Sequence, residues 1–363
     1  MDRMSQSADA GAPQPMSAGP APRKPRLSSQ VWTLAPGVVL CLVGVGLAYA
    51  LSLVIPHMSA LLIAIVLGVL VRNSMRLHHS VEPGITFSSK KLLRGGIILL
   101  GLQLALGDIL GLGLGIVALV VAVVALGLSA TALIGRALGL SRAQSLLIAC
   151  GFSICGAAAV AGAEGVIQDK DEEDTVSAVA LVVVFGTLMI PLVPLLSSAL
   201  SLTPGQAAIW TGASVHEVAQ VVAIGGTLGG TALGVAVVVK LARVLMLAPV
   251  MAWLSVMERR RAQRKAADGG AAEASISLPP IIPLFVALFI AMVIIRSLGI
   301  VPAAVVEGAG IAQTLLLGAA MFALGTGVRL SLFTRLGAKP FILAAVSTLL
   351  MLTMGLTGAL LLG

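Results

Sequence analysis

The sequence contains few charged residues, few aromatic residues and few cysteines. Of its 363 residues, 10% are charged, against about 25% in soluble domains, so an ordinary water-soluble protein is excluded. Aromatic residues make up 3%, and segments of alternating hydrophobicity are missing, which excludes a transmembrane β-barrel with aromatic girdles. The three cysteines all lie in apolar segments, so the sequence indicates neither a disulfide framework nor a cysteine-based metal site.

Apolar residues, in contrast, make up 58% of the chain. A helix that crosses a bilayer needs roughly 20 mostly apolar residues. The candidate runs are residues 36–53, 56–71, 92–110, 113–134, 145–167, 176–196, 207–224, 232–254, 281–298, 312–328 and 341–362. The sequence therefore predicts an all-α polytopic membrane protein with about 11 transmembrane helices.

The distribution of lysine and arginine predicts the orientation, because these residues concentrate in cytoplasmic connections. With the amino terminus inside, 19 of the 23 basic residues are cytoplasmic, namely Arg3, Arg23, Lys24, Arg26, Arg72, Arg76, Lys90, Lys91, Arg94, Arg136, Arg142, Arg259, Arg260, Arg261, Arg264, Lys265, Arg329, Arg335 and Lys339. We therefore expect a cytoplasmic amino terminus and an external carboxyl terminus. The acidic stretch 169–174 then falls outside, with Asp171 and Gln263 on opposite sides. Topology accounts for the net charge of +8, so nucleic acid is not an expected partner.

Two of the apolar runs, the fifth and the tenth, are interrupted by small and polar residues. These are Ser153, Ile154, Cys155 and Gly156 in one and Gly325, Thr326 and Gly327 in the other. Glycine lowers the cost of unwinding a helix, and a half-helix that begins at such a break directs its N–H groups at an anion. The alternative is close helix packing through small residues. Because the interruptions lie five spans apart, they would occupy corresponding helices of an inverted repeat, and we expect them to bind substrate.

Polar and ionisable residues interrupt the seventh and eighth runs. The seventh contains Ser214, a further candidate for substrate binding, and His216, Glu217 and Gln220; the eighth contains Lys240 and Arg243. Ionisable groups inside a membrane usually mark a pathway or a relay. We therefore expect transport to be coupled to an ion by His216, Glu217, Gln220, Lys240 and Arg243. The alternative is a paired structural network. Lys240 needs a partner, for which Glu217 is favoured over a bound anion.

The runs Gly-Phe-Ser-Ile-Cys-Gly-Ala-Ala-Ala at 151–159 and Gly-Ala-Ser-Val-His-Glu-Val-Ala-Gln at 212–220 resemble the motifs of the YeiH-type sulfate exporter family. Residues 92–106 also resemble that family, so the similarity covers nearly everything after the amino-terminal tail. The resemblance implies a carrier of the bacterial inner membrane. Its fold would be related to bile-acid symporters and sodium/proton antiporters, with two inverted five-helix repeats, an extra amino-terminal helix, and core and panel domains with two crossing broken helices.

These features divide the chain into four parts. Residues 1–30, rich in Ala, Pro, Ser and Gly, would form a disordered cytoplasmic tail. Residues 31–256 would hold the first helix, the first repeat and the start of the second. Residues 257–278, basic and then rich in Ala and Gly, would form a cytoplasmic linker, and residues 279–363 the remainder of the second repeat.

The function expected from these observations is secondary active transport of a small anion, such as sulfate or an organic sulfonate or carboxylate, by alternating access. The expected partners are that substrate, a coupling proton or sodium ion, the lipid bilayer and, as an option, a second copy of the chain. No cofactor, metal site or nucleotide motif is indicated. Two alternatives are a membrane sensor or scaffold that does not transport, and an intramembrane hydrolase using serine and His216. The second is disfavoured because Ser214 and His216 point to nearly opposite sides of a regular helix.

Overall fold

The computed structural model describes residues 27–55, 60–228, 231–268, 283–328 and 337–363, and these form helices and connecting loops without strands. Among the described residues, six helices are long and apolar enough to cross a membrane, and shorter apolar helices accompany them, such as α2 (Ala60–Ser74) and α14 (Leu284–Ser297). Large apolar side chains such as Leu114, Leu133 and Leu361 are exposed on the outside, as expected where lipid covers the surface. The expected all-α membrane protein is thus confirmed for the described residues.

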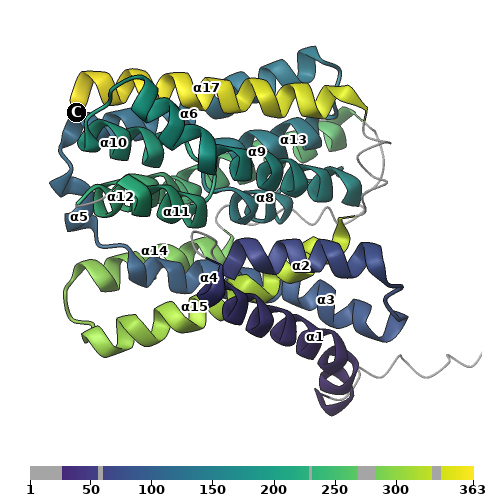
Figure 1. The fold of residues 1–363 in the computed structure, drawn as a ribbon. Coiled ribbons are helices and arrows are strands. Elements are labelled where there is room, and N and C mark those ends of the chain that lie inside the picture. Colours follow the sequence, from purple (N-terminus) through teal and green to yellow (C-terminus); the bar gives the residue numbers. More distant parts are fainter. Residues whose placement is uncertain (1–26, 56–59, 229–230, 269–282, 329–336) are drawn as a thin grey trace, which may run out of the picture.

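The helices pack in two groups (Figure 1). The scaffold group consists of α1 (Leu27–Val54), α2, α3 (Glu82–Phe87), α4 (Leu93–Leu100), α14 and α15 (Ala303–Gly327). The hairpin group consists of α6 (Leu114–Ala137), α7 (Arg142–Ser153), α8 (Ala157–Glu164), α9 (Glu172–Ala199), α10 (Pro204–Ser214), α11 (Val218–Leu228), α12 (Ala232–Leu245) and α17 (Ala338–Leu362). The remaining elements are η1 (His79–Val81), η2 (Ser88–Leu92), η3 (Gly101–Gln103), α5 (Leu106–Gly111) and α13 (Leu247–Asp268), and α13 contacts both groups.

The interruption expected at Gly325–Gly327 coincides with the carboxyl-terminal end of a helix. The helix α15 continues without interruption until it ends at Gly327. A Cβ atom on Gly325 would lie 3.0 Å from the Cα atom of Gly68, so the two glycines let α15 and α2 approach each other closely. Gly325 therefore serves close helix packing, whereas Gly327 ends the helix.

The fifth apolar run does not cross the molecule but turns back at its middle. Arg142, at the start of α7, forms an ion pair of 2.5 Å with Glu258, and the N–H group of Gln168, just after α8, donates to the same carboxylate at 3.2 Å. Both ends of the run therefore lie next to Glu258, at the same end of the molecule. A Cβ atom on Gly151 would meet Val160 at 2.7 Å, so α8 packs back against α7.

The seventh run also turns back, but it enters from the opposite end. Gln206, at the start of α10, packs against Gly363, the last residue of the chain. Gly225, near the end of α11, packs against Leu233, near the start of α12, while Val215 at the turn lies deeper along α12. In Figure 1, α5, α10 and α12 lie at the left with the carboxyl terminus. The expectation that these two runs cross the membrane is therefore wrong: each forms a half-way hairpin.

The first half-way hairpin returns the chain to the end at which it entered. The next helix, α9, therefore runs in the direction opposite to the one expected from eleven crossings. The acidic stretch consequently lies at the end of the molecule that carries most of the described basic residues, hereafter the basic end. Asp169 forms an ion pair of 3.7 Å with Arg261, and Ser141 donates to Asp174 at 3.1 Å. The expectation that Asp171 and Gln263 lie on opposite sides is wrong. The lysine and arginine count did not reveal this, because residues 197–206 contain neither residue type.

The predicted domain limits fall partly outside the described residues. The helix α13 continues to Asp268, so residues 257–268 of the expected linker are helical. Residues 269–278 of that linker and residues 1–26 of the expected tail are not among the described residues.

Cysteine labelling from each side of the membrane tests this topology. Cysteines introduced at Asp171 and Gln263 should label from the same side, and a cysteine at Gly205, where a Cβ atom would meet no other atom within 4 Å, should label from the other side. The three native cysteines are buried and should contribute little background. Labelling of Gly205→Cys and Gln263→Cys from one side would restore eleven crossings.

Candidate functional site

The tips of the two half-way hairpins touch each other inside the hairpin group. The ring of Phe152, on α7, packs against the ring of His216 with 4.5 Å between the centroids. The histidine Nδ1 atom lies 3.3 Å from the carbonyl oxygen of Phe152, and the N–H group of Ala157, which begins α8, donates to the Glu217 carboxylate at 3.1 Å. The residues predicted at 153–156 and 214–220 therefore form one site, although about 60 residues separate them in the chain.

Glycine shapes the turn of the first hairpin. Gly156 has φ of +81°, a conformation that favours glycine, and its N–H group donates to the carbonyl of Gly151 at 2.9 Å. A Cβ atom on Gly156 would collide with the side chain of Glu217. The turn therefore needs glycine both for its backbone conformation and for the approach of the second hairpin.

Lys240, on α12, joins the two turns. Its ammonium group donates to the carbonyl oxygens of Ile154 at 2.8 Å, Val215 at 2.8 Å and His216 at 2.7 Å. An ammonium group has three N–H donors, so all of them are used. The side chain is fully buried.

Arg243, one turn further along α12, has the same role. Its guanidinium group donates to the carbonyls of Phe152 and Ser153 at the end of α7 and to those of Gly212, Ala213 and Val215 at the end of α10. The last carbonyls of a helix lack intrahelical partners and carry its negative dipole end, which stabilises a cation. Lys240 and Arg243 thus cap two half-helices at once.

This arrangement corrects the expected pairing of Lys240. Within the described residues, no carboxylate lies within ion-pair distance of Lys240, and its donors face backbone carbonyls, so neither Glu217 nor an anion is its direct partner. The physical reason is that both helix breaks leave carbonyls in the interior, where an unsatisfied carbonyl is costly, and the donors of Lys240 satisfy three of them.

Glu217 and Gln220 organise the second turn. The carboxylate of Glu217, partly buried, occupies the amino-terminal end of α8, where the sequence led us to expect a bound anion. The side-chain oxygen of Gln220 accepts from the N–H group of Glu217 at 3.1 Å, as in a helix capping contact. An acidic side chain of the protein itself therefore occupies the anion position.

Two polar atoms at the tips are buried and find no hydrogen-bond partner among the described residues: Oγ of Ser153 and Nε2 of Gln220. Ser153 faces α6 near Gly127, and Gln220 faces α9 near Gly186. Unsatisfied buried polar atoms are uncommon in native proteins, and each is a candidate for contact with a ligand. Cys155 lies in the same turn and is also buried.

Ser214 and His216 do not form a nucleophilic pair. The hydroxyl of Ser214 donates to the carbonyl of Trp210 at 2.6 Å within its own helix. The Nε2 atom of His216 lies 3.1 Å from the hydroxyl of Thr348 on α17, and its Nδ1 atom faces Phe152. The histidine therefore links the hairpin tips to α17.

Thr326 and Gly327 belong to a different place, a cavity of about 690 Å³ between the two helix groups at the basic end. Arg72, Thr326 and Gly327 line its scaffold side, and Lys170 and Thr175 its hairpin side. The hydroxyl of Thr175 is buried without a partner. Gly325 lies instead in the contact between α2 and α15, so the structure does not bring 325–327 together with the hairpin tips.

Charged residues that were not among the predicted site residues also line this cavity. Lys90, on η2, which packs against α15 of the scaffold group, forms an ion pair of 3.6 Å with Glu164, at the end of α8. Lys170 donates to the carbonyls of Glu164 and Ile167. Burial lowers the pKa of Lys170 from its ordinary value, and the neighbouring Glu164 counteracts part of this effect. Of these residues, the sequence analysis counted only Lys90, as one of the cytoplasmic basic residues.

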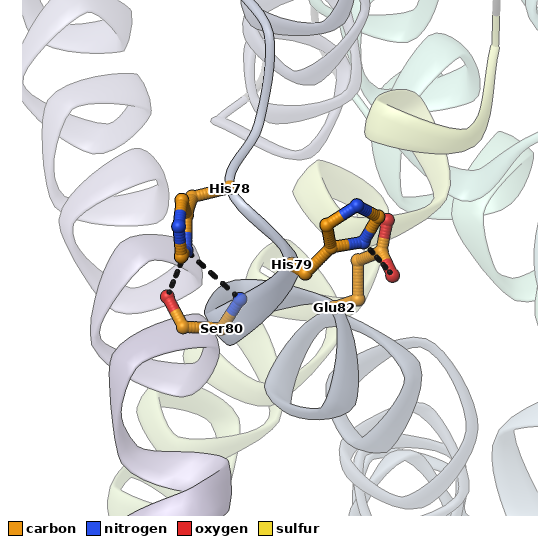
Figure 2. Close-up of polar contacts among 4 residues, drawn as sticks. All are labelled: His78, His79, Ser80 and Glu82. Carbon is orange, nitrogen blue, oxygen red and sulfur yellow. Dashed lines mark hydrogen bonds and ion pairs between the residues drawn. The ribbon is translucent and has the colours of Figure 1, made fainter.

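The histidines between α2 and α3 serve local structure. Figure 2 shows the two rings directed at different partners: His78 at Ser80, where its Nδ1 atom accepts from the backbone N–H at 3.2 Å, and His79 at Glu82, 3.2 Å away. His78 thereby caps η1. Among the described residues, no group of three or more His, Cys, Asp or Glu side chains is placed to hold a metal ion.

Fold and site together define a class of protein: a polytopic helical membrane protein in which two half-way hairpins from opposite ends meet in the interior. The YeiH-like family described as conserved hypothetical protein 698 matches residues 36–344. The chain therefore belongs to this family, and the resemblance found in its motifs is confirmed.

Relatives in several bacteria are similar over most of their length. A UPF0324 membrane protein of Corynebacterium glutamicum is 51% identical over 326 residues, which is 90% of this chain and 92% of the relative. One of Pseudomonas aeruginosa is 40% identical, covering 88% and 91%. One of Bacteroides thetaiotaomicron is 37% identical, covering 79% and 84%. No solved structure matches the chain.

A double-mutant cycle tests the capping role of Lys240. Lys240→Met should lower the free energy of unfolding by about 3 to 5 kcal/mol, as is typical when one partner of a buried charged contact is removed. Glu217→Gln should not restore this loss, because the partners of Lys240 are carbonyls. Unfolding in detergent measures both effects, with Lys339→Met at the exposed start of α17 as the control. Recovery of stability in the double variant would identify Glu217 as the partner.

Proposed function

We propose that this protein is a secondary active transporter of a small anion in the bacterial inner membrane, working by alternating access, and that it has no enzymatic activity. The observation that carries the proposal is the contact of two half-way hairpins from opposite ends, whose tips bury unpartnered polar atoms. Irregular backbone inside a membrane is tolerated where it lines a binding site, and opposed broken helices are typical of transporter sites.

Movement of the hairpin group against the scaffold group would provide alternating access, in the roles of core and panel. The cavity of about 690 Å³ between the groups would form the access route from the basic end. The ion pair between Lys90 and Glu164 bridges the groups at this cavity and would have to open and close in each cycle. Because it is partly exposed, it contributes little stability and can be broken at low cost.

The substrate would bind at the tips, where Ser153 and Gln220 offer free hydrogen-bond donors. Protonation of Glu217 would weaken its contact with the amino-terminal end of α8 and free the N–H group of Ala157 for the substrate. The ionised Glu217 carboxylate and the substrate anion would thus occupy one position in turn, and binding of a proton to Glu217 would favour binding of the anion. Sulfate, organic sulfonates and carboxylates all have oxygens that accept such hydrogen bonds.

The two alternatives have less support. A hydrolase would need a serine within reach of His216, whereas the histidine nitrogens face Phe152 and Thr348. A sensor or scaffold would not require polar atoms without partners at a contact between two hairpin tips.

Transport assays on the purified protein in liposomes test the proposal. At least one of three labelled anions, namely sulfate, an organic sulfonate and a carboxylate, should be taken up or released in response to a pH or sodium gradient. Ser153→Ala should lower the apparent affinity for that anion by about tenfold, because one hydrogen bond to a charged ligand is lost. Its stability should stay equal or rise slightly, because an unsatisfied buried hydroxyl is removed.

The control is Ser347→Ala, a buried serine whose hydroxyl donates within its own helix, to Leu343 at 2.7 Å. This variant should keep its affinity. Absence of flux for every anion under all gradients would reject a transporter, and unchanged affinity in Ser153→Ala would place the substrate elsewhere.

Glu217→Gln should flatten the pH dependence of transport while leaving insertion intact. The glutamine oxygen can still accept from the N–H group of Ala157, but the side chain no longer exchanges a proton. Flux measured across a range of pH checks this, with Asp108→Asn at the exposed start of α5 as the control. A wild-type pH profile in Glu217→Gln would assign Glu217 a structural role.

A further inference from the structure

A second pocket, of about 510 Å³, lies at the basic end, between the hairpin group and α13. It is formed where α6 ends, where α7 begins and along the later part of α13. Its wall contains five arginines and one tryptophan: Arg136, Arg142, Arg260, Arg261, Arg264 and Trp253. This pocket is separate from the hairpin tips and from the cavity between the helix groups, so nothing derived above accounts for it.

The positive charge of this arginine pocket is only partly balanced. Arg142 pairs with Glu258 at 2.5 Å and Arg261 with Asp169 at 3.7 Å. For Arg136, Arg260 and Arg264, the described part of the chain provides no acidic partner within ion-pair distance. In addition, the Nη1 atom of Arg142 is buried without a hydrogen-bond partner. The pocket therefore has guanidinium donors available for an anion.

The position of the pocket matches the surface of a bilayer. Two candidate membrane spans, Leu114–Ala137 and Ala232–Arg264, end at its arginines. Trp253, which lies seven residues before Arg260 on α13, is 51% exposed. Seven residues of helix rise by roughly 10 Å, so the tryptophan lies on the membrane side of the arginines. Tryptophan at the boundary between apolar and polar regions is typical of membrane interfaces.

We propose that the arginine pocket binds the phosphate headgroup of an anionic phospholipid. Guanidinium groups bind phosphate oxygens in pairs, which suits several arginines around one pocket. The apolar side chains of Trp253 and Met257 provide contact for the upper part of the acyl chains. A soluble anion would use the arginines but not the apolar wall, and this difference favours a lipid.

Titration of delipidated full-length protein in detergent tests the proposal. Phosphatidylglycerol should raise the melting temperature and remain bound in native mass spectrometry, while phosphatidylcholine should do neither. Arg260→Gln combined with Arg264→Gln should weaken phosphatidylglycerol retention by about 25-fold, or about fivefold per arginine. The matched control removes two exposed positive charges of the same end outside the pocket, Arg76→Gln with Lys91→Gln, and should change retention less than twofold.

Three results would overturn the proposal. The first is equal retention by the pocket variant and the control variant, which would leave only general attraction to the basic end. The second is equal binding of phosphatidylcholine. The third is full displacement of the lipid by millimolar inorganic phosphate together with the same rise in melting temperature, which would identify a site for free phosphate.

Discussion

The structure depends on how the carbonyl groups freed by two broken helices are satisfied in the interior. Where α7 and α10 end half-way, their last carbonyls have no intrahelical donors and no access to bulk water. Lys240 and Arg243 provide the missing donors from one helix, α12. Lys170 does the same for the end of α8 at the basic end. Without these cations the carbonyls at the breaks would lack hydrogen-bond donors, and the breaks would cost too much free energy. The same hydrogen bonds join both hairpin tips to α12.

This capping also explains why charged residues persist in an otherwise apolar protein. A hydroxyl or amide could satisfy one or two carbonyls, whereas an ammonium satisfies three and a guanidinium up to five. The negative ends of two helix dipoles offset the two positive charges. Glu217 occupies the positive end of α8, so the charged groups of the site face complementary backbone dipoles rather than each other. A protonation change at Glu217 therefore acts on the contact between the two hairpins.

The charged residues of the protein divide by position into three roles. Arginines at the basic end line the arginine pocket. Lys240 and Arg243 are structural caps. Lys90 and Glu164 connect the two helix groups across a cavity, in a partly exposed ion pair that contributes little stability. Each role follows from the depth at which the charge lies and from what surrounds it.

The sequence by itself determined the membrane class, the family and the residues of both hairpin tips, because apolar runs, polar interruptions and buried charges are local properties. It also placed Ser153, Gly156, His216 and Glu217 among the candidates. Only the tertiary structure decided that these runs turn back, that Gly325 serves packing and that Lys240 faces carbonyls. A hydropathy pattern is the same for a crossing helix and for a hairpin of equal length. The loop after α9 carries no lysine or arginine, so charge could not reveal its side. Whether a run crosses or turns back depends on which donors bind the carbonyls at the turn. Those donors, on Lys240 and Arg243, are far from the turns in the chain.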